Sequence, residues 1–296
     1  MKKYFGGIEA GGTHFNCIIA NGPDDILAEI QLPTTSVKTT LSSVSDFFRE
    51  QISSTDIKIE AIGLGSFGPV DLKPDSKTYG SITCTPKPGW QNTPILKILE
   101  KELSIPVTFE TDVNCAAIGE MTWGTGKALK DFIYITVGTG IGGGIIIDRK
   151  PVHGLTHSEL GHILIPHDIN KDPFVGNCPF HQDCFEGLAS GPAMEKRWEM
   201  KAENMPREHP AWQLEAEYIS LALHNYLCTL SPQKIILGGG VMQNAFLFPL
   251  IRKRILLLLN QYIQSPALSK HINQYVVPPG LGKRSGSLGA IALAQH

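Results

Sequence analysis

The chain has 296 residues, a length that favours one large or two ordinary domains with a substantial buried core. Hydrophobic residues make up 42% and charged residues 18%, which excludes a long disordered or low-complexity chain. The net charge is -2, so no overall positive field favours nucleic acid or anionic lipid, and we expect a small-molecule partner. No apolar stretch approaches the ~20 residues that cross a bilayer. Six scattered cysteines do not suit a disulfide scaffold, and we expect a cytoplasmic protein.

Strands and helices alternate along the first part of the chain. Short strands are predicted over 4–9, 15–20 and 26–32, joined by glycine-containing turns as in a meander. The pattern then predicts a helix over 41–52, a strand over 59–64, a strand over 106–110 and a helix over 113–123. This alternation is typical of an α/β layered fold.

A second cycle opens in the same way as the first. A strand over 132–137, a glycine turn and a strand over 143–148 repeat the opening about 127 residues later, as in an internal duplication. The later elements are predicted over 212–230 (helix), 234–237 (strand), 246–262 (helix), 275–277 (strand) and 287–294 (helix). The stretch 151–191 breaks this pattern.

The glycine turns are candidate phosphate sites. Gly138–Gly143 fits the string G-x-G-x-x-G, but a strand and not a helix follows, which excludes a dinucleotide-binding fingerprint. A P-loop is also absent, because the nearest match, Gly124–Lys127, lacks the outer glycine. A single turn of this kind more often only permits a sharp hairpin. Two such turns heading duplicated halves, with Gly238–Gly240 as a third cluster, favour a nucleotide site.

Five motifs carry a family resemblance through their order and spacing: Glu9-Ala10-Gly11-Gly12-Thr13, Thr111-Asp112-Val113-Asn114, Val137-Gly138-Thr139-Gly140-Ile141-Gly142, Glu159-Leu160-Gly161-His162 and Leu237-Gly238-Gly239-Gly240. They resemble the ROK family of sugar kinases, and the match covers almost the whole chain. Within that family, the stretches 65–69, 178–187 and 277–282 look most like the bacterial fructokinases.

The resemblance implies an α/β fold of the actin-like ATPase (ribonuclease H-like) class, with duplicated lobes around a cleft. We expect a small lobe over 1–118, with the C-terminal helix 286–296 packed back on it, and a large lobe over 119–285 that carries a zinc-binding loop at 162–184. The implied reaction is transfer of the γ-phosphate of ATP to the 6-hydroxyl of D-fructose, with Mg²⁺. The implied ATP-binding residues are Gly11, Gly12, Thr13, Thr139, Gly140, Gly238, Gly239 and Gly240.

Asp112 is the expected general base. It follows a predicted strand and precedes a helix, where carboxylates of α/β folds point into the cleft. The local sequence alone fits a helix cap equally well. Similarity to the family motif favours the base, with Asn114 supporting the loop.

The sugar is expected to contact residues that match the family's positions, since each buried hydroxyl needs a hydrogen-bond partner. Isolated glutamates are by default solvated surface residues, which is the alternative for Glu159 and Glu186. The expected substrate-binding residues are Gly65, Asn114, Glu159, His162 and Glu186.

Glu9 departs from the family pattern. The first family motif usually begins with aspartate, and glutamate stands here, as it often does in fructokinase-like members. A carboxylate is kept, and the resemblance implies a role near Mg²⁺, through a water molecule.

Cys178, His181 and Cys184 lie within seven residues of one another, and His162 lies upstream. Four such ligands suit a tetrahedral structural zinc, which would pin an irregular loop and orient the sugar pocket. The alternative is two free thiols and two surface histidines.

Other functions stay open at this stage. A kinase for glucose, mannose or an N-acetylhexosamine would use the same ATP and base residues. A non-catalytic, sugar-sensing ROK regulator would carry a DNA-binding segment before the core. Here the first strand begins at Tyr4, so we do not expect that function. The expected partners are a hexose and ATP, with no nucleic acid or membrane, and a second copy of the chain in a homodimer.

Overall fold

The computed structural model describes residues 3–55 and 57–296 of the chain. Contacts between residues divide the chain into two compact units. Unit 1 comprises Met1–Ala128, Gly144–Ser158 and Gly280–His296. Unit 2 comprises Leu129–Gly143 and Glu159–Pro279. Unit 1 is therefore built from three separate stretches of chain and unit 2 from two.

The sheet of unit 1 has the strand order β3-β2-β1-β4-β5. Its strands are β1 (Lys3–Ala10), β2 (His14–Gly22), β3 (Asp25–Pro33), β4 (Lys58–Ser66) and β5 (Val107–Thr111). The first three strands pair antiparallel, which confirms the predicted meander. β4 then pairs parallel to β1, and β5 pairs parallel to β4, as crossover connections require.

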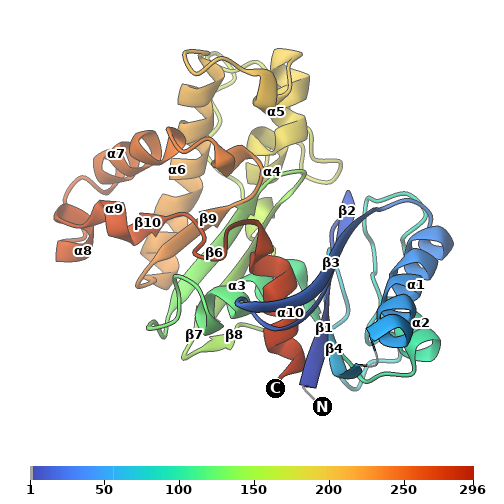
Figure 1. Ribbon diagram of the computed structural model, residues 1–296. Helices are drawn as coiled ribbons and strands as arrows, with labels where there is room; N and C mark the ends of the chain where they lie inside the picture. Colours follow the sequence, from blue (N-terminus) through green and yellow to red (C-terminus); the bar gives the residue numbers. More distant parts are fainter. Residues whose placement is uncertain (1–2, 56) are drawn as a thin grey trace. The chain divides into compact units, whose positions relative to one another are not determined.

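Helices cover both faces of this sheet (Figure 1). α1 (Val37–Thr55) and α2 (Ile95–Leu103) lie on one face, and α3 (Asp112–Thr122) and α10 (Ser285–Ala294) lie on the other. α3 and α10 pack closely against one another.

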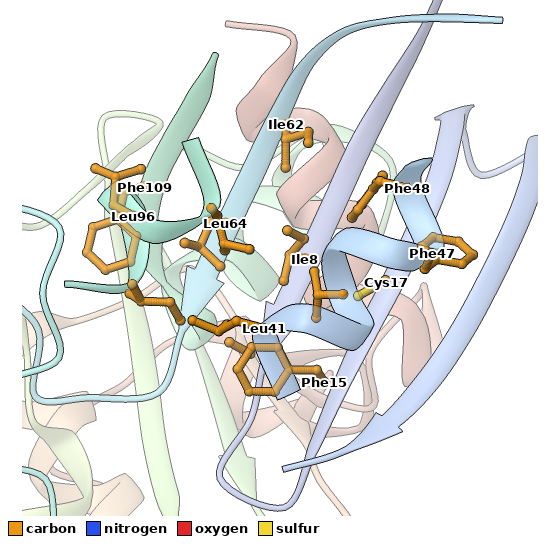
Figure 2. Close-up of a cluster of buried hydrophobic side chains, with 14 of the residues drawn as sticks. Ile8, Phe15, Cys17, Leu41, Phe47, Phe48, Ile62, Leu64, Leu96 and Phe109 are labelled. Atoms are coloured by element: carbon orange, nitrogen blue, oxygen red, sulfur yellow. The ribbon is translucent and has the colours of Figure 1, made fainter. Parts of the chain in front are cut away.

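Alternation along the strands supplies both cores. Figure 2 shows Ile8, Phe15 and Cys17 of the sheet gathered against Leu41 and Phe48 of α1. The intervening residues of β2, such as Ile18, point to the opposite face and pack against α10. Each strand of the meander therefore contributes to two apolar layers.

The second sheet has the order β10-β9-β6-β7-β8. In unit 2, β6 (Phe132–Val137), β9 (Ile235–Gly238) and β10 (Val276–Val277) are parallel neighbours. β7 (Ile141–Ile147) passes from the residues of unit 2 into those of unit 1, where it pairs with β8 (Lys150–Pro151).

The α-helices of unit 2 are α4 (Phe185–Ala189), α5 (Gly191–Trp198), α6 (Ala211–Leu230), α7 (Leu247–Leu259), α8 (Pro266–Ser269) and α9 (Ile272–Tyr275). The described residues also form 3₁₀ turns: η1 (Leu160–His162), η2 (Ala202–Asn204) and η3 (Val241–Gln243) in unit 2, and η4 (Gly282–Arg284) in unit 1.

Several predicted element ends differ from the structure: the helix predicted over 41–52 spans Val37–Thr55, and two further ends have a clear local reason. The helix predicted to reach residue 262 ends at Leu259, because Asn260 adopts the left-handed conformation with φ 43°. The strand predicted to start at residue 275 starts at Val276, since Tyr275 closes α9. Along residues 3–55 and 57–296, no helix has both the length and the apolar character to span a bilayer.

Candidate active site and metal centre

Asp112 is the first residue of α3 and follows β5 directly. The helix is capped by Thr111, whose hydroxyl oxygen accepts the N–H of Asn114 at 3.1 Å. Asp112 Oδ1 instead accepts the neighbouring N–H of Val113 at 2.9 Å. The capping role that the local sequence offered for Asp112 therefore belongs to Thr111.

A second carboxylate, Glu110, holds this turn in unit 1. Glu110 is 5% exposed, and its Oε1 accepts the N–H of Thr111 at 2.8 Å and Nδ2 of Asn114 at 3.0 Å. Its Oε2 lies 2.7 Å from Nε2 of His153, and this hydrogen bond raises the pKa of His153. Asn114, only 2% exposed, thus supports the turn through Glu110.

Sequence reasoning missed both Glu110 and His153. They are 43 positions apart, so no local motif joins them. The one available signal was a second carboxylate two residues before Asp112.

Glu9 lies on β1 and is held by the amide of Asn16, which is held in turn by the amide of Gln31. Asn16 Nδ2 donates to Glu9 Oε2 at 2.9 Å, and Gln31 Nε2 donates to Asn16 Oδ1 at 2.9 Å. Burial raises the pKa of Glu9 to about 7; the Asn16 bond opposes this rise, and the charge of Asp112 adds to it. Glu9 and Asp112 therefore lie within electrostatic reach of each other in unit 1.

Two glycines make room for these carboxylates. A Cβ atom on Gly286 would lie 2.1 Å from Glu9 Oε1. A Cβ on Gly65 of β4 would lie 2.7 Å from Cys115 Sγ and 3.2 Å from the Cα of Asp112. Gly65 therefore allows the start of α3 to approach the sheet closely.

The β1–β2 turn contains Gly11, Gly12 and Thr13. Gly11 donates its N–H to the carbonyl of His14 at 2.9 Å, which closes the turn. A Cβ on Gly12 would meet no atom within 4 Å. The turn therefore leaves open space beside its backbone, as a phosphate-binding turn requires.

In unit 2, the turn between β6 and β7 and the end of β9 lie together. The β6–β7 turn holds Thr139 and Gly140, and Gly138 donates its N–H to the Gly140 carbonyl at 2.9 Å. A Cβ on Gly138 would lie 3.7 Å from the nitrogen of Gly240. Gly239 has φ +93°, and a Cβ there would lie 2.3 Å from the Val137 carbonyl oxygen. The structure thus brings the second and third glycine clusters together.

The expected sugar residues of unit 2 also lie close to one another. His162 Nε2 lies 4.0 Å from Glu186 Oε1. Partial loss of hydration raises the pKa of Glu159; His162 opposes this rise, and the charge of Glu186 adds to it. Glu159, His162 and Glu186 therefore share one electrostatic environment.

Four candidate metal ligands meet at one point in unit 2. The ligand atoms of His162, Cys178, His181 and Cys184 lie within 4.8 Å of one another. His162 Nδ1 lies 3.8 Å from Cys178 Sγ and 3.6 Å from Cys184 Sγ, and His181 Nδ1 lies 3.7 Å from Cys178 Sγ. Tetrahedral zinc, with bonds of ~2.3 Å to sulfur and ~2.05 Å to nitrogen, holds sulfur and nitrogen ligands ~3.6 Å apart. The donor set and its distances therefore fit zinc.

Glycines and a buried ion pair shape the loop that carries these ligands. Gly176 has φ +94°, and a Cβ on Gly187 would lie 1.8 Å from the Gln182 carbonyl oxygen. Asp172, 4% exposed, accepts a hydrogen bond from Nε of Arg197 at 3.1 Å. The loop is therefore fixed to α4 and α5 as well as by the ligand cluster.

Comparison with known protein families matches residues 5–296 to the ROK family. A fructokinase of Pediococcus pentosaceus is 42% identical over 98% of this chain and 97% of that protein. A fructokinase of Lactococcus lactis subsp. cremoris is 42% identical over 99% of this chain and 98% of that protein. The crystal structure of a ROK hexokinase from Thermus thermophilus matches 99% of this chain and 98% of that chain, with 25% identity and a TM-score of 0.78.

Proposed function

The chain belongs to the ROK family, and from this membership we propose that it is a fructokinase, which transfers the γ-phosphate of ATP to the 6-hydroxyl of D-fructose. Its fold is of the actin-like ATPase class expected from the sequence, with mixed α/β sheets. The structural observation that carries the proposal is the placement of Asp112, which starts a helix capped by another residue.

Phosphoryl transfer to a hydroxyl needs an acceptor for the hydroxyl proton and neutralisation of phosphate charge. Asp112 is the proposed acceptor. Because Glu110 binds Thr111 and Asn114 on either side of it, the Asp112 backbone is held in one place. A fixed base avoids the cost of orienting it at the moment of reaction.

We propose two sets of ATP-binding residues, one in each unit taken by itself: Gly11, Gly12 and Thr13 in unit 1, and Thr139, Gly140, Gly238, Gly239 and Gly240 in unit 2. The open space at Gly12 and Gly240 supports this assignment. Magnesium suits the carboxylate of Glu9, a hard oxygen donor that lies within electrostatic reach of the Asp112 charge. Glu9 would hold the ion through water, and the ion would neutralise phosphate charge.

The sugar is proposed to contact Glu159, His162 and Glu186, which lie together in unit 2. Gly65 and Asn114 act from unit 1 by shaping and supporting the Asp112 turn. Zinc bound by His162, Cys178, His181 and Cys184 would fix residues 162–184 and, through His162, the orientation of the sugar residues.

The family further supports three proposals about the whole protein. We propose that it acts as a homodimer, that it is cytoplasmic, and that its small lobe comprises 1–118 with 286–296 and its large lobe 119–285. Its substrates are a hexose and ATP.

A coupled assay of ADP release over a panel of hexoses tests the function. We expect fructose to give the highest kcat/KM, and Asp112→Asn to lose at least ~100-fold in kcat, the lower range for removal of a general base. Asp24→Asn, an exposed aspartate of unit 1, is the matched control and should keep full activity. Full activity of Asp112→Asn would remove that residue from the base role, and a preference for glucose, mannose or an N-acetylhexosamine would reassign the substrate.

A further inference from the structure

Glu186 has two carboxylate oxygens that face different neighbours in unit 2. Oε1 lies 4.0 Å from His162 Nε2, on the side of the expected sugar residues. Oε2 accepts the N–H of Ile141 at 2.8 Å, at the point where the β6–β7 turn enters β7. A single side chain, half-buried with 24% of its surface exposed, therefore joins the expected sugar residues to the expected phosphate turn.

The absence of a side chain at position 140 leaves room for this contact. A Cβ atom on Gly140 would lie 2.8 Å from Glu186 Oε2 and would push the carboxylate away from the Ile141 N–H. The turn without a side chain at this position thus lets a protein carboxylate approach its backbone, as it would a phosphate.

A second hydrogen bond fixes the other side of the same turn. Gly191 donates its N–H to the Gly138 carbonyl at 2.8 Å. Glu186 and Gly191 lie at the two ends of a six-residue stretch made of α4 and the start of α5. The turn from Gly138 to Ile141 is therefore held at both of its ends by one short segment.

This segment is itself fixed by the ligand loop. Asn177 donates its N–H to the Gly187 carbonyl at 2.9 Å, and Gly187 packs directly on the Gln182 carbonyl. Cys184, one of the four candidate ligands, is the N-cap residue of α4 and stands two positions before Glu186. The ligand loop, α4 and the β6–β7 turn are therefore connected by direct contacts.

We propose that Glu186 is a positioning residue for the nucleotide: its carboxylate holds the β6–β7 turn in the conformation that binds phosphate, in addition to contacting the sugar. This inference rests on the proposed function. It assigns to Glu186 an effect on nucleotide binding when no sugar is present, which a pure sugar contact would not have.

Three substitutions at this position separate the two roles. Glu186→Ala removes the acceptor, and Glu186→Asp withdraws it by one methylene, so both lose the bond to Ile141. Glu186→Gln keeps an amide oxygen that can accept the same N–H while it removes the carboxylate from the sugar. Glu159→Gln alters another expected sugar residue, and it is the matched control.

The measurement is calorimetric titration with magnesium and a non-hydrolysable ATP analogue, without sugar. We expect dissociation constants about tenfold higher for Glu186→Ala and Glu186→Asp, the order of a lost hydrogen bond to a charged acceptor. Glu186→Gln and Glu159→Gln should stay within about threefold of the unsubstituted protein, although both lose affinity for fructose. Amide hydrogen exchange gives a second readout: the Ile141 N–H should exchange faster in the Ala and Asp variants and stay protected in Glu186→Gln.

If the unsubstituted protein phosphorylates fructose and Glu186→Ala binds the nucleotide analogue with unchanged affinity, this inference is overturned and the proposed function stands. An equal loss in Glu186→Gln and Glu186→Ala would also overturn it, because the retained acceptor would then have no effect. If the unsubstituted chain binds neither the nucleotide analogue nor fructose, the proposed function fails and this inference fails with it.

Discussion

At the scale of single residues, the Asp112 turn is held by the carboxylate of Glu110, which no sequence motif predicted. Glu110 collects hydrogen bonds from Thr111, Asn114 and His153, which belong to the end of β5, to α3 and to the segment after β8. The sequence indicated Asp112 and Asn114 through a local motif, but the partner at position 153 follows only from the folded chain. Local sequence spacing predicts contacts between residues a few positions apart. It does not predict contacts between residues that are far apart in sequence and that the strands and crossover connections bring together.

The pair of Glu110 and His153 leads to a prediction of pH dependence. The hydrogen bond raises the pKa of His153, so its contribution to stability is complete below the unfolded value of about 6.5 and is lost as the pH rises through the raised value. His153 is half-exposed, which limits that contribution to under about 1 kcal/mol. In Glu110→Gln, we expect the pKa of His153, followed by NMR titration, to fall toward its ordinary value. Glu50→Gln, on the exposed side of α1, is the control. Equal His153 titration in both variants would contradict the assignment.

At the scale of elements, most of unit 1 was predictable because its signals are local. Alternating strands joined by glycine turns predicted the meander, and apolar spacing predicted α1, α3 and α10. α2 was missed because it starts after Pro94 without any side-chain cap, so nothing in the sequence marks its beginning. The helix expected to start at residue 246 is α7, which starts at Leu247, and the 3₁₀ turn η3 that lies between Gly240 and this helix was not predicted.

The contact between α3 and α10 gives a prediction about packing. A Cβ on Gly289 would lie 1.7 Å from the Cys115 carbonyl oxygen, and one on Gly119 would lie 2.9 Å from the Gly289 nitrogen. Gly289→Ala should destabilise unit 1 by about 3 kcal/mol, the upper end of typical overpacking, although alanine favours helices more than glycine does. Urea unfolding measures the loss. Gly154→Ala, where the nearest atom is 4.0 Å away, should change stability by less than about 1 kcal/mol. Similar stability of both variants would disprove close helix packing.

At the scale of the whole molecule, the cluster of candidate metal ligands bears on how far the stability of unit 2 depends on a bound metal. The spacing of Cys178, His181 and Cys184 pointed to this cluster from sequence alone, since three ligands fall within one loop. Its bonds to α4 could not be predicted, because they run through backbone groups such as those of Asn177 and Gly187.

We expect about one zinc ion per chain in protein purified without chelator. Cys178→Ser should lose most of that zinc and lower the melting temperature by several degrees, because metal binding contributes to folding free energy. Cys228→Ser replaces an exposed thiol outside the cluster and should keep both the metal and the melting temperature. Elemental analysis and thermal denaturation supply the two readouts. Equal zinc content in the two variants would exclude Cys178 as a ligand.

The hydrogen bonds of Glu120 in α3 limit when unit 1 can finish folding during synthesis of the chain. This fully buried carboxylate accepts hydrogen bonds from the N–H groups of Gly280 and Leu281 and from the hydroxyl of Ser285, which lie 160 to 165 positions later. A ribosome that has made every residue of unit 2 has not yet made those three partners. Unit 1 therefore begins first during translation and is finished last: Glu120 can bond early to the nearby N–H of Thr125, but its donors at 280, 281 and 285 are made only after all of unit 2.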